Sequence, residues 1–179
     1  MKTIAVAVDG SDFANAALGV ACDMAVRNGA ELVACHAVTD EPLRGDAFRF
    51  ALAEFGTEIA GRLRDVALGR GRVPGEITEE AIRGDRDAAA AMNTVVGEGI
   101  LEAAEATAQR AGVAQVRRRL LVGSPGAELV NFVIAEAPDV LVVGTRGLGG
   151  VEGLLMGSVS RHVAQAPCMV VSVKLAPQT

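Results

Sequence analysis

The glycines and serines between Gly144 and Ser160 form the part of the sequence best suited to chemistry. Six glycines fall in the stretch from Gly144 to Gly157, and Ser158 and Ser160 follow where a helix is expected to begin. Backbone N–H groups at a helix start have no partner within the helix, and together with the helix dipole they favour an anion. Serine hydroxyls there can also donate to phosphate oxygens. The stretch therefore predicts a phosphate-binding loop.

Asp9 is the second candidate, because it stands at the end of an apolar run that begins at Thr3. A carboxylate is poorly suited to bind an anion directly, but Mg²⁺ prefers carboxylate and phosphate oxygens together. Asp9 therefore predicts a magnesium ion held through bound phosphates. Each candidate has a structural alternative: Asp9 before Gly-Ser is also a frequent helix cap, and the glycines at 144, 147 and 157 can serve turns and close packing alone.

The two histidines do not complete a catalytic set. His36 lies inside an apolar run, which is typical of a structural histidine, and His162 lies close in sequence to the two serines. His162 would suit a general base, but no nucleophile, base and orienting group can be named together. We therefore predict no catalytic residue and a protein that is not an enzyme, with very slow ATP hydrolysis as the upper limit.

Composition narrows the class of protein. The chain has 179 residues, half of them hydrophobic, with 3% aromatic residues and a net charge of −5. The acidic balance argues against binding to nucleic acid through phosphate neutralisation. Three cysteines without a C-x-x-C pair favour buried thiols in a reducing compartment. The first ten residues do not resemble a signal peptide, and no apolar run approaches the roughly 20 residues of a membrane span, so a cytoplasmic protein is predicted.

Short apolar runs alternate with helical patterns along the chain. Continuous runs are typical of strands buried on both faces, whereas apolar residues at spacings of three and four indicate helices. Strand–helix–strand repetition implies right-handed crossovers and an open, largely parallel α/β sheet with helices on both faces. Gly29 is the expected end of the first helix, and Leu129, Val133 and Ile134 belong to the expected inner face of a later one. The expected strands are 3–9, 30–38, 116–123, 138–144 and 166–174, and the expected helices are 10–29, 126–137 and one after residue 157.

The segment from residue 41 to residue 92 carries no strand signal and is too long for a bare loop in a compact domain. Apolar residues at helical spacing predict one helix over 48–66 and a second over 92–107. Between them, residues 69–87 are rich in charge, glycine and proline, which predicts an exposed loop. We expect one domain, residues 1–179, with an enlarged segment at about 41–92.

The spacing of the glycines decides between the known nucleotide motifs. The P-loop pattern G-x-x-x-x-G-K-[ST] is absent, and G-x-G-x-x-G fails because Glu152 stands at its third glycine. The sequence instead has Gly144-x2-Gly147-x9-Gly157-Ser158, with "VDGS" closing the first strand and "PCMVVSV" near the end. In these features it resembles the universal stress protein family over nearly the whole chain, much of segment 41–92 excepted.

That resemblance implies a five-stranded parallel sheet in the order 3-2-1-4-5 and an ATP-binding regulatory or stress-response protein. Carried over by position, it implies that Asp9 lies near the phosphates and Mg²⁺. The remaining implied contacts are Ala37 and Val38 to adenine, Gly144 and Arg146 to ribose, and Gly147, Gly157, Ser158 and Ser160 to phosphates. Two departures are the longer segment after the second strand and the additional glycines within the nine-residue spacer.

Two other classes of function remain open from the sequence. One is a slow ATPase or nucleotidyl-transfer enzyme on a similar sheet, although the H-x-G-H signature usual in such transferases is absent. The other is a dimeric interaction module that carries the motif without binding a ligand. Phosphate or pyrophosphate release would identify the first, and lack of bound nucleotide would identify the second.

The last strand predicts a homodimer. In the order 3-2-1-4-5 the third and fifth strands are both edges, and Arg117, Arg118 and Arg119 place charge on the third, which discourages pairing. The run from Met169 to Val173 carries no charge, so a second copy can pair with it about a two-fold axis. The alternative is that the long segment 41–92 covers this edge.

Overall fold

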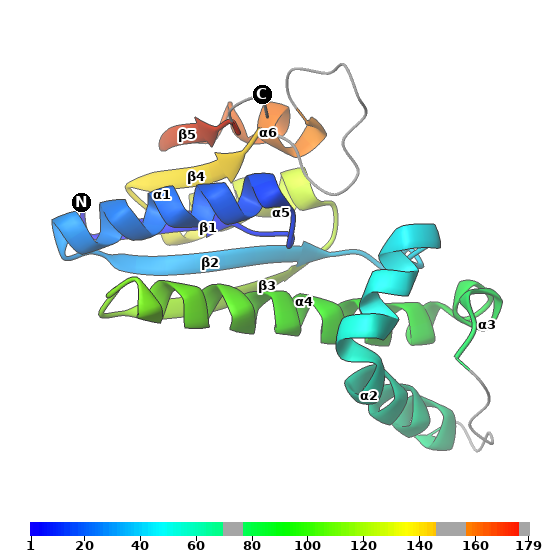
Figure 1. The fold of residues 1–179 in the computed structure, drawn as a ribbon. Coiled ribbons are helices and arrows are strands. Elements are labelled where there is room, and N and C mark those ends of the chain that lie inside the picture. The colour runs from blue at the N-terminus through cyan, green and yellow to red at the C-terminus, as the bar shows by residue number, and fades with distance from the viewer. Residues whose placement is uncertain (70–76, 146–156, 176–179) are drawn as a thin grey trace. The chain divides into compact units, whose positions relative to one another are not determined.

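The computed structural model describes residues 1–69, 77–145 and 157–175 (Figure 1). The chain divides into two compact units, one of residues 1–37 with 100–179 and one of residues 38–99. The enlarged segment expected at 41–92 thus falls within the second unit, and the expected single domain stays a prediction. Among the described helices, none is both long and apolar enough to cross a bilayer.

Five strands form a parallel sheet in the order β3-β2-β1-β4-β5, as predicted. Parallel pairing is seen in the registers Ile4 with Leu32, Ile4 with Val140, and Leu141 with Val170. The chain order reverses between the neighbours β1 and β4, which is where ligands bind in open α/β sheets. The strands are β1 (Thr3–Ala7), β2 (Glu31–Val38), β3 (Val116–Val122), β4 (Val140–Gly144) and β5 (Met169–Val173).

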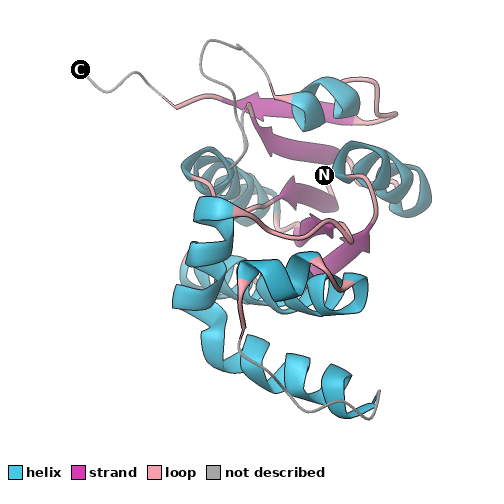
Figure 2. Cartoon of the chain, turned by 90° about the vertical axis from the view of Figure 1, so that its right-hand side faces the viewer, coloured by secondary structure: helices cyan, strands magenta, loops and turns pink. Residues whose placement is uncertain are grey.

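Helices cover both faces of the sheet (Figures 1 and 2). The first unit contains α1 (Asp12–Asn28), α5 (Pro125–Glu136), α6 (Ser158–Val163) and the part of α4 (Arg86–Arg110) that starts at Ile100. Helix α1 and that part of α4 lie on one face and α5 on the other. Gly29 ends α1 in the left-handed conformation with φ 59°, as the sequence predicts.

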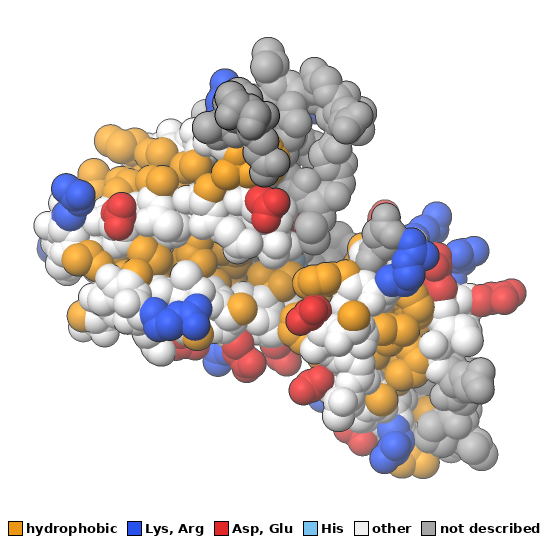
Figure 3. All heavy atoms as spheres, viewed as in Figure 1, with side chains coloured by type: hydrophobic (Ala, Val, Ile, Leu, Met, Phe, Trp, Pro, Cys, Tyr) orange, Lys and Arg blue, Asp and Glu red, His pale blue; other side chains and the backbone are white. Residues whose placement is uncertain are grey.

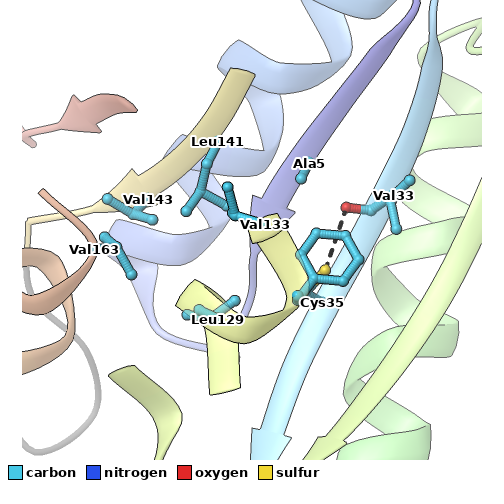
Figure 4. Close-up of a cluster of buried hydrophobic side chains, with 9 residues drawn as sticks. Ala5, Val33, Cys35, Leu129, Val133, Leu141, Val143 and Val163 are labelled. Atoms are coloured by element: carbon cyan, nitrogen blue, oxygen red, sulfur yellow. Dashed lines mark hydrogen bonds between the residues drawn. The ribbon is translucent and has the colours of Figure 1, made fainter. Parts of the chain in front are cut away.

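The core forms because side chains of the central strands are buried on both faces. On one face, Ala5, Val33 and Leu141 pack against Leu129 and Val133 of α5 (Figure 4). Cys35 joins this cluster, and burial raises the pKa of its thiol to about 12. The thiol is therefore protonated near neutral pH and acts as a small apolar side chain. This agrees with the expectation of buried thiols for Cys35.

The inner face of α5 differs from the predicted one, which also included Val130 and Ala137, because both Ile134 and Ala137 are exposed. Ile134 was expected to face inward, but it is 64% exposed, whereas Phe132 is 6% exposed. The buried residues Gly126, Leu129 and Val133 follow one stripe along the helix, and Phe132 widens that stripe on the side away from Ile134. Apolar character alone could not fix the edge of the stripe.

The second unit contains the helices of the enlarged segment. The helix predicted over 48–66 lies within α2 (Gly45–Gly69), which is non-helical at Phe55 (φ −125°, ψ 18°). A Cβ on Gly99 would lie 2.2 Å from the Phe55 ring, so Gly99 leaves the space that the ring fills. The predicted loop 69–87 is wrong in part, because it contains helix α3 (Glu79–Arg83), whose Ile82 is buried.

The arginines of edge strand β3 are ion-paired. Arg117 donates from Nε to Glu31 at 2.6 Å and from a terminal nitrogen to Glu136 at 2.9 Å. Arg119 Nε reaches the other oxygen of Glu136 at 2.9 Å. The middle arginine, Arg118, pairs instead with glutamates of α4. The predicted charge on this edge is therefore present, and it is neutralised by glutamates on both sides of the strand.

The Glu136 pair network predicts a pH-dependent contribution to stability. Hydrogen bonds from Arg117 and then Arg119 lower the pKa of Glu136. A carboxyl group whose pKa is lower in the folded than in the unfolded protein stabilises the fold. This contribution is complete above the unfolded pKa of about 4.3, and it is lost as the pH falls through the pKa of the folded protein. Glu136→Gln should cost about 1 kcal/mol at pH 7, as expected for a partly exposed network, and less at pH 3.5, below the unfolded pKa.

Urea unfolding at the two pH values measures this difference. Glu102→Gln is the matched control, because the Glu102 side chain is 68% exposed and pairs with Arg118 at 3.2 Å. A Glu136→Gln deficit equal at both pH values would show that packing, not charge, supplies the stabilisation.

Candidate functional site

The turn after β1 fixes the position of Asp9. Its Oδ1 accepts a hydrogen bond from the backbone N–H of Ser11 at 3.0 Å, and Gly10 adopts φ +81°, which favours glycine. Ser11, not Asp9, caps α1, because its hydroxyl accepts from the N–H of Ala14 at 3.2 Å. The capping alternative for Asp9 is therefore wrong. Asp9 shapes the turn, and its half-buried carboxylate lies at the carboxyl end of β1.

His36 ties the carboxyl ends of β1 and β2 together. Its Nδ1 lies 2.7 Å from the carbonyl oxygen of Val8, so Nδ1 carries the proton that is donated. Burial lowers the pKa of His36, against smaller opposite effects of the Val8 hydrogen bond and Asp9. The ring is thus neutral near pH 7 and holds the residue that precedes Asp9. This agrees with the expected structural role.

Ala37 and Val38, the predicted adenine contacts, are the last residues of β2. Ala37 is half-buried and the Val38 side chain is 7% exposed. With its side chain packed away, Val38 can offer a ligand little beyond its backbone groups.

Gly144, the first glycine of the motif, is needed for packing. A Cβ there would lie 2.8 Å from the carbonyl carbon and oxygen of Phe13, in the first turn of α1. Real Cβ atoms essentially never come this close, and backbone atoms cannot yield as a flexible side chain can. The packing alternative for the glycines is thus supported at this position. Sequence reasoning missed Phe13, because the contact joins residues 131 positions apart.

Thr145 and Gly157 hold the two ends of the motif together. The N–H of Gly157 donates to the carbonyl of Thr145 at 2.7 Å, and the N–H of Thr145 donates to the carbonyl of Val173 at 2.9 Å. Thr145 is 2% exposed. Between these ends, the predicted contacts Arg146 and Gly147 and the spacer glycines lie outside the described residues.

The two serines of α6 have different surroundings. Ser160 is 3% exposed, and its hydroxyl donates to the carbonyl of Gly144 at 2.6 Å. Ser158 is exposed at the first position of the helix. The first intrahelical bond runs from the N–H of Arg161 to the carbonyl of Gly157. The N–H groups of residues 158–160 therefore precede the helix ladder and can donate outward, whereas the Ser160 hydroxyl is already used.

His162 packs against the first turn of α5. A Cβ on Gly126 would lie 2.8 Å from the Cβ of His162, so the histidine fills the space over this glycine. Among residues 1–69, 77–145 and 157–175, no group of three or more His, Cys, Asp or Glu side chains is arranged to hold a metal. A metal at Asp9 would need further ligands from a bound molecule.

Comparisons with known proteins agree on one family. A family model described as the universal stress protein family matches residues 1–174. A universal stress protein of Thermus aquaticus, from the region 3′ of a QAH/OAS sulfhydrylase gene, is 33% identical over 175 residues, which cover 97% of this chain and 98% of that protein.

Solved structures share the fold at lower identity. A universal stress protein family member of Arabidopsis thaliana with AMP bound aligns with a TM-score of 0.58 and 19% identity, covering 99% of this chain and 94% of that one. The universal stress protein of Archaeoglobus fulgidus in complex with dAMP aligns with a TM-score of 0.54 and 22% identity, covering 97% and 98%.

The contact between Gly144 and Phe13 predicts that even one methyl group at residue 144 destabilises the fold. Gly144→Ala should lower the free energy of unfolding by about 1–3 kcal/mol, the usual cost of overpacking. Gly19→Ala is the control, because an added Cβ at Gly19 in α1 meets nothing within 4 Å. It should raise stability by up to about 1 kcal/mol through helix propensity. Urea unfolding without nucleotide measures both, and a Gly144→Ala variant as stable as wild type would contradict the packing role.

Proposed function

The chain belongs to the universal stress protein family, and from this premise we propose that it is an ATP-binding member that acts as a nucleotide-dependent regulatory or stress-response protein. One observation carries the proposal: β1 and β4 are parallel neighbours at the point where the strand order reverses. The Asp9 turn and the glycine-rich motif therefore follow the carboxyl ends of two adjacent parallel strands. Ligands of open α/β sheets bind at this place.

The recorded ligands of two structural relatives support an adenine nucleotide. The Arabidopsis thaliana and Archaeoglobus fulgidus proteins carry AMP and dAMP, which share the adenine base. In this chain, we place the base against the backbone of Ala37 and Val38 at the end of β2. The ribose then lies beside Gly144 and Arg146.

The phosphates and the metal are assigned to groups around α6 and β1. Gly147 and Ser158 would contact phosphate oxygens through backbone N–H groups and the exposed Ser158 hydroxyl, joined by the N–H of Ser160. Gly157, whose N–H is bonded to Thr145, would allow the phosphates to approach because it has no side chain. Helix α6 has six residues, so individual N–H donors matter more here than a long helix dipole. Asp9 would hold Mg²⁺ jointly with the phosphates, which fits its single carboxylate, since Mg²⁺ commonly binds through one or two carboxylates plus substrate phosphates.

We further propose that the nucleotide is bound without ordinary turnover. The histidines, the commonest general bases, both have contacts that fit structural roles. His36 is neutral and donates to the Val8 carbonyl, and His162 packs on Gly126. A bound nucleotide would then act through the conformation or partners of the protein.

The nucleotide site predicts that a side chain at residue 157 blocks phosphate approach. Gly157 has φ −69° and ψ 165°, a conformation that valine also adopts, so Gly157→Val should fold. Its affinity for ATP with Mg²⁺ should fall at least about tenfold in titration calorimetry, the equivalent of about 1.4 kcal/mol. Gly19→Val, the same substitution at an exposed helix position, is the control.

Wild-type affinity in the Gly157→Val variant would contradict the phosphate assignment. Phosphate release by the wild-type protein is measured on the same samples. A rate of about 1 s⁻¹ or faster, ordinary for an enzyme, would overturn the proposal of binding without turnover.

We also propose that two copies pair through β5. This strand is an edge of the sheet, Met169 is 56% exposed, and hydrophobic side chains gather over β5 in Figure 3. The opposite edge, β3, carries paired charges instead. An apolar edge strand without charge readily pairs with another strand, and a two-fold arrangement closes the assembly at two copies.

Val171→Lys tests the dimer. It would place like charges close together about the two-fold axis, so the variant should be monomeric at micromolar concentration. Light scattering after size-exclusion chromatography measures the mass. Arg118→Gln on the other edge is the control and should leave the dimer intact. A monomeric wild-type protein would contradict the proposal.

A further inference from the structure

Asn93 in α4 is a buried polar side chain that none of the roles above uses. The residue is 6% exposed, and its amide nitrogen Nδ2 donates two hydrogen bonds. One reaches the carbonyl oxygen of Thr39 at 2.7 Å, and the other reaches that of Glu41 at 2.8 Å. Both amide protons thus go to backbone groups more than fifty positions earlier in the sequence. All these residues belong to the second unit.

The orientation of the amide is fixed by these contacts. A reversed amide would point its oxygen at two carbonyl oxygens, which accept and cannot donate. In the observed orientation, Oδ1 is buried without a donor among the described residues. An unsatisfied buried acceptor is unfavourable for the fold, so core packing does not explain an asparagine here. The two donated hydrogen bonds give this residue its specific use.

The segment that Asn93 holds directly follows β2. Thr39 is the next residue after Val38, the end of the strand, and residues 39–44 form neither helix nor strand. The Thr39 hydroxyl also accepts from the N–H of Glu41 at 3.3 Å. Three hydrogen bonds therefore set the orientation of the peptide groups from 39 to 41, and the connection from Thr39 to Val38 is covalent.

We propose that Asn93 is a positioning residue that gives the nucleotide site its preference for adenine by fixing the backbone after β2. The inference rests on the proposed function, in which backbone groups at the end of β2 contact the base. Adenine presents an amino donor beside a ring acceptor, whereas guanine presents a carbonyl acceptor beside an N–H donor. A backbone held in one orientation matches only one pattern, because the other leaves its groups unpaired. Without the hydrogen bonds from Asn93, the peptide groups after β2 could rotate, and the site would no longer distinguish adenine from guanine.

Asn93→Asp tests this, because a carboxylate of nearly the same shape loses both donors and repels the two carbonyls. Thr94→Val is the matched control: its hydroxyl donates only to the Ala90 carbonyl within α4, at 2.8 Å. Affinities for ATP, GTP and inorganic triphosphate are measured by calorimetry with Mg²⁺. In Asn93→Asp, ATP affinity should fall about tenfold while affinity for GTP and triphosphate stays within about twofold. Thr94→Val should match wild type for all three.

The outcomes separate this inference from the proposed function. If wild-type protein binds ATP but the ratio of ATP to GTP affinity is the same in wild type and Asn93→Asp, the inference is wrong and the proposed function stands. If wild-type protein binds no ATP, both are wrong. Should Asn93→Asp fail to fold by circular dichroism, Asn93→Ser carries the test. Its hydroxyl retains one donor, so its ratio of ATP to GTP affinity should fall below the wild-type ratio by less than about tenfold, and an unchanged ratio would overturn the inference equally.

Discussion

The close approach of Gly144 to Phe13 is the constraint on which the candidate site depends. With no side chain at residue 144, the end of β4 can lie against the backbone of the first turn of α1. That turn begins at Ser11, whose N–H is bound by Asp9. The first turn of α1 thereby connects the end of β4, through its backbone at Phe13, to the Asp9 carboxylate, through the N–H of Ser11. The carbonyl oxygen of Gly144 accepts a hydrogen bond from the Ser160 hydroxyl, which connects α6 to the end of β4 as well.

The architecture of the first unit could be predicted from the sequence because buried parallel strands leave a simple pattern. Each central strand must be apolar on both faces, so it appears as a short continuous run, and helical patterns separate the runs. The family resemblance added the strand order. Smaller features escaped prediction for physical reasons. Helix α3 has five residues and one buried side chain, and the break at Phe55 depends on space left by Gly99, 44 positions later.

In the candidate site, residue types and spacing indicate where the site lies, whereas packing contacts decide what each side chain does. The glycine spacing and Asp9 pointed to the carboxyl ends of two strands, and these strands, β1 and β4, are neighbours in the sheet. The sequence could not show that the Ser160 hydroxyl serves β4, that Ser11 caps α1, or that Gly144 makes room for Phe13. Each depends on a contact whose partner is not marked by composition. Asn93 was overlooked for the same reason, since an asparagine within a helical pattern carries no signal of a distant carbonyl.

A motif whose glycines also serve packing is still informative about binding, because the two requirements fall on different parts of it. Gly144 and Thr145 on one side and Gly157 on the other are tied to the sheet by main-chain hydrogen bonds and close contact. Residues 146–156 connect two ends whose separation is already fixed. The entropic cost of closing such a connection grows only slowly with its length, so closure of the chain alone places little demand on the nine-residue spacing. The presence of both Gly147 and this spacing in one sequence is therefore consistent with the proposed nucleotide site, in which a molecule approaches the backbone there.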